Sequence, residues 1–388
     1  MLLHGAMRIA PLPWIAGAAA GIGVSLAATS AFAAPGQPQL QYVYGGSAGT
    51  VVFIHGKGDC SRGMGDCNGG DATSGPAAYW TNSSNDATLL NEATTSVGSN
   101  GTSYYEAFAI GYDLDNQGYW YSANDVGWCL QDLYQGTNNS GCNPSGYQRS
   151  SFHVVTHSAG ATVIDRLLST GWYGVNAHVS GWVVAVAPAL AGSRAASALY
   201  GVDGYGNFCT GLVSWLAGWA LKSNGAASLT RGTVVGQANA GYAGRAPSWI
   251  LKVPSTGGSW SANNDGCGTF WGGVTVREDD NDCAMGALAG CLGYSNSDDM
   301  DGLVYWSDAD PTNNTGGNGC NTSDTNDGSG VSSCQYYGQF SGAYWHWFTT
   351  WANHSHSRDD AYTTLGDWQS ANGCVTRSPG TCVGQYGL

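Results

Sequence analysis

Residues 152–169 constrain the fold most, because three different patterns follow one another there without a gap. Residues 152–156 form an apolar, β-branched run that is typical of a strand. Residues 157–160, His-Ser-Ala-Gly, form a short turn, and residues 159–169 have the spacing of a helix that ends before Gly171. A strand that turns directly into a helix indicates an α/β chain.

Similar apolar runs recur along the chain between loops rich in Gly, Asn and Ser. Several are continuous rather than alternating, as in strands that are covered on both faces of a parallel sheet. We therefore expect one α/β domain over residues 34–388, with a mostly parallel central sheet flanked by helices. The expected strands are 50–54, 105–110, 152–156, 182–187, 233–236, 249–253 and 274–276.

Two stretches are typical of insertions into such a domain. Residues 195–231 contain an apolar run, 212–219, that predicts either a lid over a hydrophobic pocket or a buried helix. Residues 308–330 consist mainly of Asn, Asp, Gly, Thr and Ser, which predicts a long surface loop.

The first 33 residues have the pattern of a signal peptide. Arg8 supplies a basic start, an apolar run follows, and Ala31 and Ala33 provide the small residues before a cleavage site. The alternative is a membrane anchor, but the apolar run is shorter than the ~20 residues that a spanning helix needs. We expect a secreted or periplasmic protein without a membrane anchor in its mature form.

Twelve cysteines in an exported chain indicate disulfide bonds. They fall into close pairs, and short loops close at little cost in entropy. The chain has no C-x-x-C pair, so a zinc site is not expected. We assign no metal site. The expected pairs are Cys60–Cys67, Cys129–Cys142, Cys209–Cys267, Cys283–Cys291, Cys320–Cys334 and Cys374–Cys382.

The charge balance excludes two classes of partner. The chain has 27 acidic and 13 basic residues, with a formal net charge of -14. Nucleic acids and anionic membrane surfaces both favour clustered Lys and Arg. We therefore expect neither as a partner.

The strand, turn and helix around Ser158 match the nucleophile elbow, in which a serine hydroxyl is exposed on a strained turn. Small residues two positions before and after the serine allow strand and helix to approach closely, and the helix N-terminus stabilises negative charge. Here Thr156 replaces the first glycine of G-x-S-x-G, while Gly160 provides the second. The pattern predicts Ser158 as a nucleophile.

Three further motifs accompany this turn in order. An apolar strand leads into His55, Gly56 and Lys57, a second strand ends near Pro188, and an Asp-Gly-Leu-Val stretch occupies 301–304. With these motifs the chain resembles bacterial secreted lipases and the related extracellular polyester depolymerases, over roughly residues 51–360. The resemblance implies an α/β-hydrolase fold and no cofactor. In this chain we also expect a lid-like insertion and several disulfides.

The resemblance also implies a catalytic acid and a catalytic base. The acid would be Asp301, with Asp299 and Asp280 as alternatives, and it would hold the tautomer of the histidine. The base would be His354, with His356 as the alternative.

Other roles follow from the same resemblance. The backbone N–H groups of Lys57 and Ala159 would bind the oxyanion, whereas His157 would support the elbow rather than act as the base. His346 lies among aromatic residues, which indicates a core or pocket wall. Many of these lipases bind calcium through an acidic residue after the catalytic histidine, but Ser355 stands in that region, so a calcium site is not transferred.

The sequence thus predicts a secreted serine hydrolase that cleaves lipid or polyester carboxylic esters through an acyl-enzyme intermediate. One alternative is a non-catalytic secreted protein that binds surfaces or carbohydrate on the same fold. The ordered Ser, Asp and His favour the enzyme, since binding does not require them. A second alternative, an amidase or peptidase on this scaffold, stays open.

Overall fold

The computed structural model describes residues 36–47, 49–63, 67, 75–80, 105–179, 181–202, 223–236, 249–253 and 344–347. The chain divides after Ala33, and every described residue belongs to the part that follows. The expected strand at 274–276, the apolar run 212–219 and the expected loop 308–330 lie outside the described residues.

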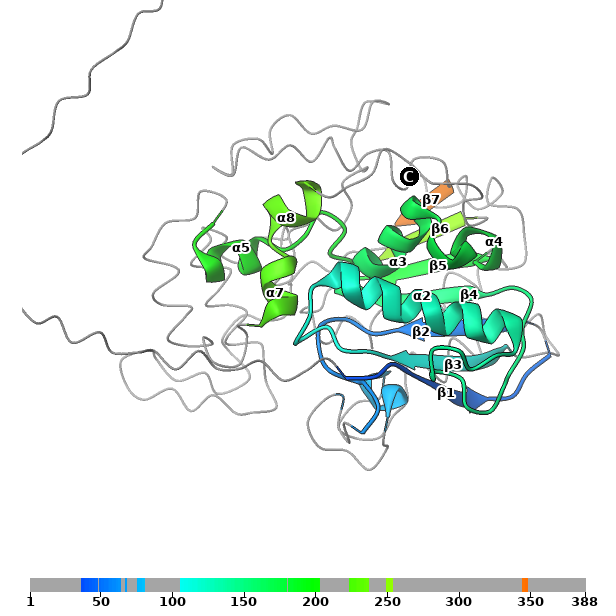
Figure 1. Ribbon diagram of the computed structural model, residues 1–388. Helices are drawn as coiled ribbons and strands as arrows, with labels where there is room; N and C mark the ends of the chain where they lie inside the picture. Colours follow the sequence, from blue (N-terminus) through cyan, green and yellow to red (C-terminus); the bar gives the residue numbers. More distant parts are fainter. Residues whose placement is uncertain are drawn as a thin grey trace, which may run out of the picture. The chain divides into compact units, whose positions relative to one another are not determined.

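The described residues form a seven-stranded sheet with the order β1-β3-β2-β4-β5-β6-β7 (Figure 1). Strand β1 pairs antiparallel with β3, and the other neighbours pair in parallel. The strands are β1 (Gln39–Tyr44), β2 (Thr50–Ile54), β3 (Glu106–Gly111), β4 (His153–His157), β5 (Trp182–Val186), β6 (Trp249–Val253) and β7 (Tyr344–Trp347). The mostly parallel sheet expected from the continuous apolar runs is confirmed.

The centre of the sheet places the ends of two strands side by side. All residues of β2 and β3 are buried, as expected for strands covered on both faces. In the register of β2 with β4, Ile54 lies opposite Thr156. The loop after β2 and the turn after β4 therefore leave the same edge of the sheet.

Two long helices pack against each other over one face of the sheet (Figure 1). They are α2 (Tyr119–Gln135) and α3 (Ala159–Thr170), followed by η2 (Trp172–Gly174) and α4 (Val175–His178). Helix α3 ends as expected at Gly171, which has φ 67° and donates its N–H to the carbonyl of Leu167. The apolar sides of α2 and α3 meet residues of the sheet in one buried core.

One expected strand is wrong. Residues 233–236 belong to the helix α8 (Arg231–Gly236), although Thr233 and Val234 are β-branched. The N–H of Arg231 donates to Ser197 Oγ, Val234 N–H donates to the carbonyl of Thr230, and Val234 is fully buried. These contacts outweigh a β-propensity that spans only ~1 kcal/mol.

Parts of the expected lid are short helices. They are α5 (Arg194–Tyr200) and α7 (Asn224–Ser228). Each has a serine N-cap, Ser193 or Ser223, whose side chain accepts a backbone N–H three residues later. The lid itself stays a prediction.

Two of the six expected disulfides are present. Cys60–Cys67 and Cys129–Cys142 have Cα–Cα separations of 4.7 and 5.4 Å. The second joins α2 to the segment that leads into β4. The other four expected pairs lie outside the described residues. Among the helices that the structure describes, none has the length and hydropathy to cross a membrane.

Candidate active site

Ser158 lies on the sharp turn between β4 and α3. Its backbone has φ 54° and ψ −127°, an uncommon conformation for a residue other than glycine. The N–H of Ser158 donates to the carbonyl of Val186 at 2.9 Å, and its own carbonyl accepts N–H groups from Ala161 and Ala189 at 3.2 Å. Because both neighbouring segments hold this turn, the strained conformation persists.

Glycines allow the turn to approach the loop after β2. A β-carbon on Gly160 would lie 2.4 Å from the carbonyl oxygen of His55, and one on Gly56 would lie 2.7 Å from Ser158 Cβ. Thr156 is fully buried at the position where the G-x-S-x-G pattern has its first glycine, and its Oγ1 lies 3.5 Å from the carbonyl of Val184. The close approach therefore depends on Gly56 and Gly160 and tolerates a larger residue at 156.

The loop after β2 is braced by His55 and Tyr112. His55 is 1% exposed, its Nε2 accepts the N–H of Tyr112 at 3.2 Å, and its Nδ1 lies 2.7 Å from the carbonyl oxygen of Gly56. Since Nε2 accepts, Nδ1 carries the proton and donates to Gly56. The hydroxyl of Tyr112 donates to the carbonyl of His55, and the two rings stack with centroids 4.0 Å apart. The loop is thereby fixed in one orientation.

Burial keeps this imidazole neutral. It lowers the pKa of His55 from 6.5 to about 4. Burial also lowers the pKa of His153, in β4, to about 4.

Acidification should therefore destabilise the fold between pH 6.5 and about 4. In this window the unfolded chain binds a proton at His55 that the folded chain does not, so the free energy of unfolding falls as the pH falls. Below about pH 4 both states are protonated and the contribution stops changing. The full shift at His55 corresponds to ~3 kcal/mol.

Urea unfolding of the wild type and His55→Asn between pH 7.5 and 4 measures this contribution. We expect the variant to be less stable at pH 7.5, because it loses the ring, but to depend less on pH. An equal pH dependence in both proteins would contradict the assignment of the proton uptake to His55.

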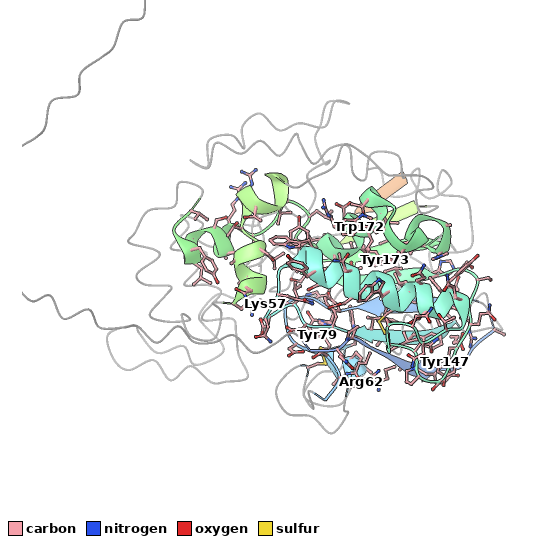
Figure 2. The ribbon with its side chains drawn as sticks, in the orientation of Figure 1. Lys57, Arg62, Tyr79, Tyr147, Trp172 and Tyr173 are labelled. Atoms are coloured by element: carbon pink, nitrogen blue, oxygen red, sulfur yellow. A yellow bond between two sulfur atoms is a disulfide. The ribbon has the colours of Figure 1, made fainter. Side chains whose placement is uncertain are left out.

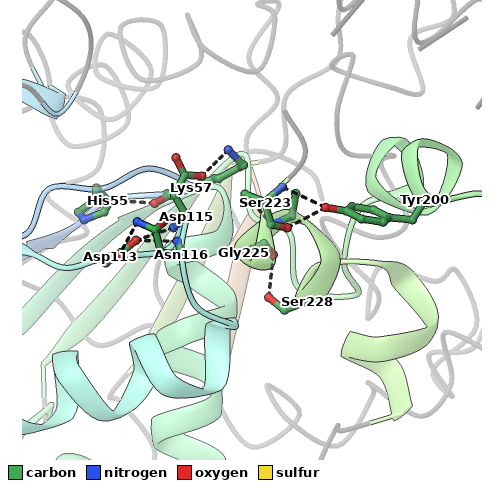
Figure 3. A network of polar contacts seen from close by, with 11 residues as sticks. His55, Lys57, Asp113, Asp115, Asn116, Tyr200, Ser223, Gly225 and Ser228 are labelled. Atoms are coloured by element: carbon green, nitrogen blue, oxygen red, sulfur yellow. Dashed lines mark hydrogen bonds and ion pairs between the residues drawn. The ribbon is translucent and has the colours of Figure 1, made fainter. Parts of the chain in front are cut away.

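The side chain of Lys57 is held in an ion pair rather than at the serine. Its Nζ lies 2.5 Å from Asp115 Oδ1, as Figure 3 shows. The carboxylate of Asp113 accepts the N–H groups of Asp115 and Asn116, and so orders the turn that carries Asp115. The ion pair thus anchors the loop after β2 to the loop after β3.

Two backbone N–H groups lie on the segments that meet at Ser158. Lys57 follows Gly56, whose α-carbon faces Ser158, and Ala159 is the first residue of α3. Neither N–H donates a hydrogen bond within the described part of the chain. Lys57 and Ala159, the two donors predicted from the sequence, therefore lie on the two segments that meet at Ser158.

Tyr79 is a further residue at this place, and no sequence pattern indicated it. It belongs to the short helix η1 (Pro76–Trp80) and is 6% exposed. Its hydroxyl lies 2.6 Å from His157 Nδ1 and 2.7 Å from the position of a β-carbon on Gly56. Figure 2 shows Tyr79 and Lys57 near the same end of the sheet. The role predicted for His157, support of the elbow, fits this contact.

A cavity of about 560 Å³ opens at the start of α2, beside α7 and α8. Its wall includes the amides of Asn116, Gln117 and Asn224 and the rings of Trp120 and Tyr121, with no charged side chain among the described residues. Asn116 directly follows the carboxylate that pairs with Lys57. The cavity therefore lies at the same edge of the sheet as the loop after β2.

The predicted acid and base lie outside the described residues. This applies to Asp301 with its alternatives Asp299 and Asp280, and to His354 with its alternative His356. The described residues thus bring together the serine and the two N–H donors of the predicted site.

His346, interpreted from the sequence as core or pocket wall, lies in β7 opposite Leu251 of β6.

The sheet and the elbow together fit an α/β-hydrolase fold. The sheet is mixed, with β1 antiparallel at one side, and the serine turn follows a central parallel strand and opens a helix.

No family model matches the chain, and no curated protein matches it. Among solved structures, the chain is similar to the lipase BlEst2 from Bacillus licheniformis in its mature form. The identity is 14%, the match covers 86% of this chain and 97% of that chain, and the TM-score is 0.46. The lipase from Staphylococcus hyicus is 12% identical, with 84% and 94% covered and a TM-score of 0.41. The carboxylesterase CesB from Bacillus subtilis is 10% identical, with 87% of each chain covered and a TM-score of 0.33.

Proposed function

We propose that this chain is a serine hydrolase that cleaves carboxylic esters through an acyl-enzyme intermediate. One observation carries the proposal: Ser158 is held at a strained turn, against a braced loop, with the N–H groups of Lys57 and Ala159 beside it. A serine that only stabilised the fold would not require a strained backbone next to two N–H groups that have no acceptor among the described residues.

In the proposed reaction, a histidine takes the proton of Ser158 while Oγ attacks the ester carbonyl. The N–H groups of Lys57 and Ala159 donate to the resulting oxyanion. The alcohol leaves with the proton from the histidine, and water then hydrolyses the acyl-enzyme by the same steps. Loss of one oxyanion donor typically costs ~10²–10³ in rate.

The catalytic acid and base stay proposals based on the sequence. We assign the base to His354, with His356 as the alternative, and the acid to Asp301, with Asp299 and Asp280 as alternatives. We would substitute these residues one at a time by Asn or Ala and measure ester hydrolysis. The histidine and the aspartate whose loss abolishes hydrolysis are the base and the acid.

We propose an uncharged ester, of a lipid or polyester, as the substrate. The cavity beside Asn116 supports this because amides and aromatic rings line its described wall, and such a wall provides no opposite charge for a charged group. We also propose that residues 1–33 direct export and that residues 195–231 include a lid.

A substrate panel tests the reaction class. The full chain, expressed with its N-terminal segment and purified after export, is given p-nitrophenyl butyrate, p-nitrophenyl palmitate, a polyester film and the p-nitroanilide of butyric acid. We expect hydrolysis of at least one ester and no turnover of the anilide. Turnover of the anilide alone would indicate an amidase, and inertness toward all four would contradict an esterase.

A further inference from the structure

We propose that the cavity of about 560 Å³ at the start of α2 binds a neutral sugar unit. Side-chain amide oxygens of its wall accept hydrogen bonds from the sugar hydroxyl groups, and the ring of Trp120 packs against the sugar. This inference goes beyond the proposed function. An uncharged wall fits any neutral ligand, whereas the polar atoms of this wall favour a ligand with several hydroxyl groups.

Hydrogen bonds join the two segments that form the wall. The N–H of Gly225 in α7 donates to the carbonyl of Asp115 at 3.1 Å, and Asn224 Nδ2 donates to the carbonyl of Asn116 at 2.8 Å. A β-carbon on Gly225 would lie 1.6 Å from the carbonyl oxygen of Leu114, so α7 lies directly against the loop after β3. Figure 3 shows both segments, with Asn116 on the loop and Gly225 in α7. The cavity is thus formed before a ligand binds, and its volume lies in the range of ~300–1,000 Å³ that small-molecule sites occupy.

The side-chain amides of the wall use their nitrogen atoms for bonds within the protein. Asn116 Nδ2 donates to Asp113 Oδ2 at 2.9 Å, and Gln117 Nε2 donates to Asp125 Oδ2 at 2.6 Å. Burial raises the pKa of Asp125 to about 6, so this carboxyl group is ionised and only accepts at neutral pH. The nitrogen of Asn224 faces a backbone carbonyl, which also only accepts. The oxygen of each amide is therefore the atom left for a ligand.

These amide oxygens determine the class of ligand. Among the hydrogen bonds of the described residues, none is donated to the side-chain oxygens of Asn116, Gln117 and Asn224. The ligand must therefore bring donors, and hydroxyl groups provide them without charge. A plain acyl chain would desolvate the oxygens without a partner, which costs free energy. An anion would meet oxygen atoms, and a cation would meet no carboxylate in the described wall. A sugar unit meets all of these conditions.

Trp120 provides the apolar surface for the sugar. Its ring is half-buried and packs against the buried core, and the ring of Tyr119 meets it edge-on with centroids 5.4 Å apart. Gly118 leaves room for the indole, because a β-carbon there would lie 2.9 Å from Trp120 Cζ2. A sugar has C–H groups on its faces and hydroxyl groups at its rim, so it can contact an aromatic ring and amides at the same time.

The sugar can come from one of two sources with the same chemistry. It can be the alcohol part of the ester substrate, or a unit of a polysaccharide to which the enzyme attaches. The position of the cavity, at the same edge of the sheet as the loop after β2, suits the first source. That source rests on the proposed function, whereas sugar binding itself does not.

Calorimetric titration at neutral pH measures binding separately from catalysis. The full chain carrying Ser158→Ala is titrated with cellobiose, maltose and mannobiose, and with hexanol and choline as ligands that lack the hydroxyl pattern. We expect at least one disaccharide to bind with a Kd of about 1 mM or lower, and hexanol and choline to bind at least about tenfold more weakly. Absence of binding by all three disaccharides, or tighter binding of hexanol or choline, would overturn the proposal.

Trp120→Leu tests the ring, because it keeps an apolar side chain and removes the aromatic face. We expect the Kd of the bound disaccharide to rise about tenfold, as for loss of one stacked ring, and Trp120→Phe to keep most of the affinity. Trp128→Leu is the matched control, since Trp128 lies on the same helix but lines a different cavity. Weaker binding in Trp128→Leu than in Trp120→Leu places the sugar elsewhere and rejects the proposed site.

Asn224→Ala tests the amides at an exposed position, where the fold should tolerate the change. Loss of one hydrogen bond should raise the Kd by about three- to tenfold. Asn139→Ala is its control, because Asn139 is also exposed and its amide nitrogen also donates one bond, to Thr137 Oγ1. Urea unfolding curves show whether each variant is folded. Unchanged affinity in folded Asn224→Ala and Trp120→Leu would contradict the assignment of the sugar to this cavity.

A sugar ester distinguishes the two sources. The wild type and Trp120→Leu, both with Ser158 in place, are given a monoacetylated cellobiose and p-nitrophenyl acetate. If the sugar is part of the substrate, the variant should lose about tenfold in kcat/KM on the sugar ester alone. If the sugar belongs to a polysaccharide, both esters should be hydrolysed as by the wild type, although disaccharide binding is weaker. A wild type that binds the disaccharide and hydrolyses no ester would contradict the proposed function and leave the sugar site supported.

Discussion

Replacing Ser158 with alanine should reduce kcat for ester hydrolysis by about 10⁴-fold or more. The hydroxyl is the proposed nucleophile, and removal of a nucleophile leaves only the residual effect of binding and the oxyanion donors. The fold should survive, because the Ser158 side chain makes no capping hydrogen bond at the start of α3. Initial rates on p-nitrophenyl butyrate and a urea unfolding curve measure the two effects separately.

Ser151→Ala provides the matched control for this substitution. Ser151 is exposed and precedes β4, so its loss should change neither rate nor stability. If Ser158→Ala retained more than a tenth of the wild-type rate while Ser151→Ala behaved as expected, another residue would have to be the nucleophile.

Replacing Gly160 with alanine should both destabilise the protein and nearly abolish its activity. In an ordinary helix this change stabilises by roughly 0.5–1 kcal/mol. Here the new β-carbon would lie 2.4 Å from the carbonyl oxygen of His55 and 2.5 Å from that of Ile54. Both atoms are backbone, so relief requires moving α3 away from β2 and from the loop after β2.

We expect a loss of about 2–3 kcal/mol in the free energy of unfolding and a decrease in kcat of about 10²-fold or more, because misplacing reacting groups by 1 Å can cost that much. Ala161→Gly is the control, since it changes the next residue of α3 in the opposite direction. It should cost about 1 kcal/mol and leave kcat nearly unchanged. A Gly160→Ala protein as stable and active as the wild type would contradict the close approach of α3 and β2.

The central sheet could be predicted from the sequence because burial on both faces leaves a continuous apolar run. This pattern predicts β2, β3, β4 and β5 within one or two residues. The pattern does not predict β1, which is antiparallel and mostly half-buried, because Gln39 and Gln41 interrupt its apolar residues.

The sequence pattern also does not predict two of the helices. Helix α2 mixes aromatic, small and polar residues, and buried Ser122 and Asp132 interrupt its apolar face. Helix α8 carries β-branched residues that favour a strand. In both cases the helix depends on contacts with distant segments, such as the bond from Arg231 N–H to Ser197 Oγ, and local propensity does not reveal these.

The turn at Ser158 could be predicted because strand, turn and helix follow one another in the sequence. The roles predicted for Ser158, Lys57 and Ala159 stay proposals, as do those of the predicted acid and base. Tyr79 could not be found in this way, because 78 residues separate it from His157 and only the fold brings them together.

Labelling with a fluorophosphonate tests the central claim most directly. The probe phosphonylates a serine only when its oxygen is activated and the oxyanion donors hold the adduct. We predict one label per folded chain, mapped by peptide mass spectrometry to Ser158 and absent from Ser158→Ala and from the urea-unfolded protein. A folded, ester-hydrolysing protein that takes no label at Ser158, or takes it at another residue, would contradict the account.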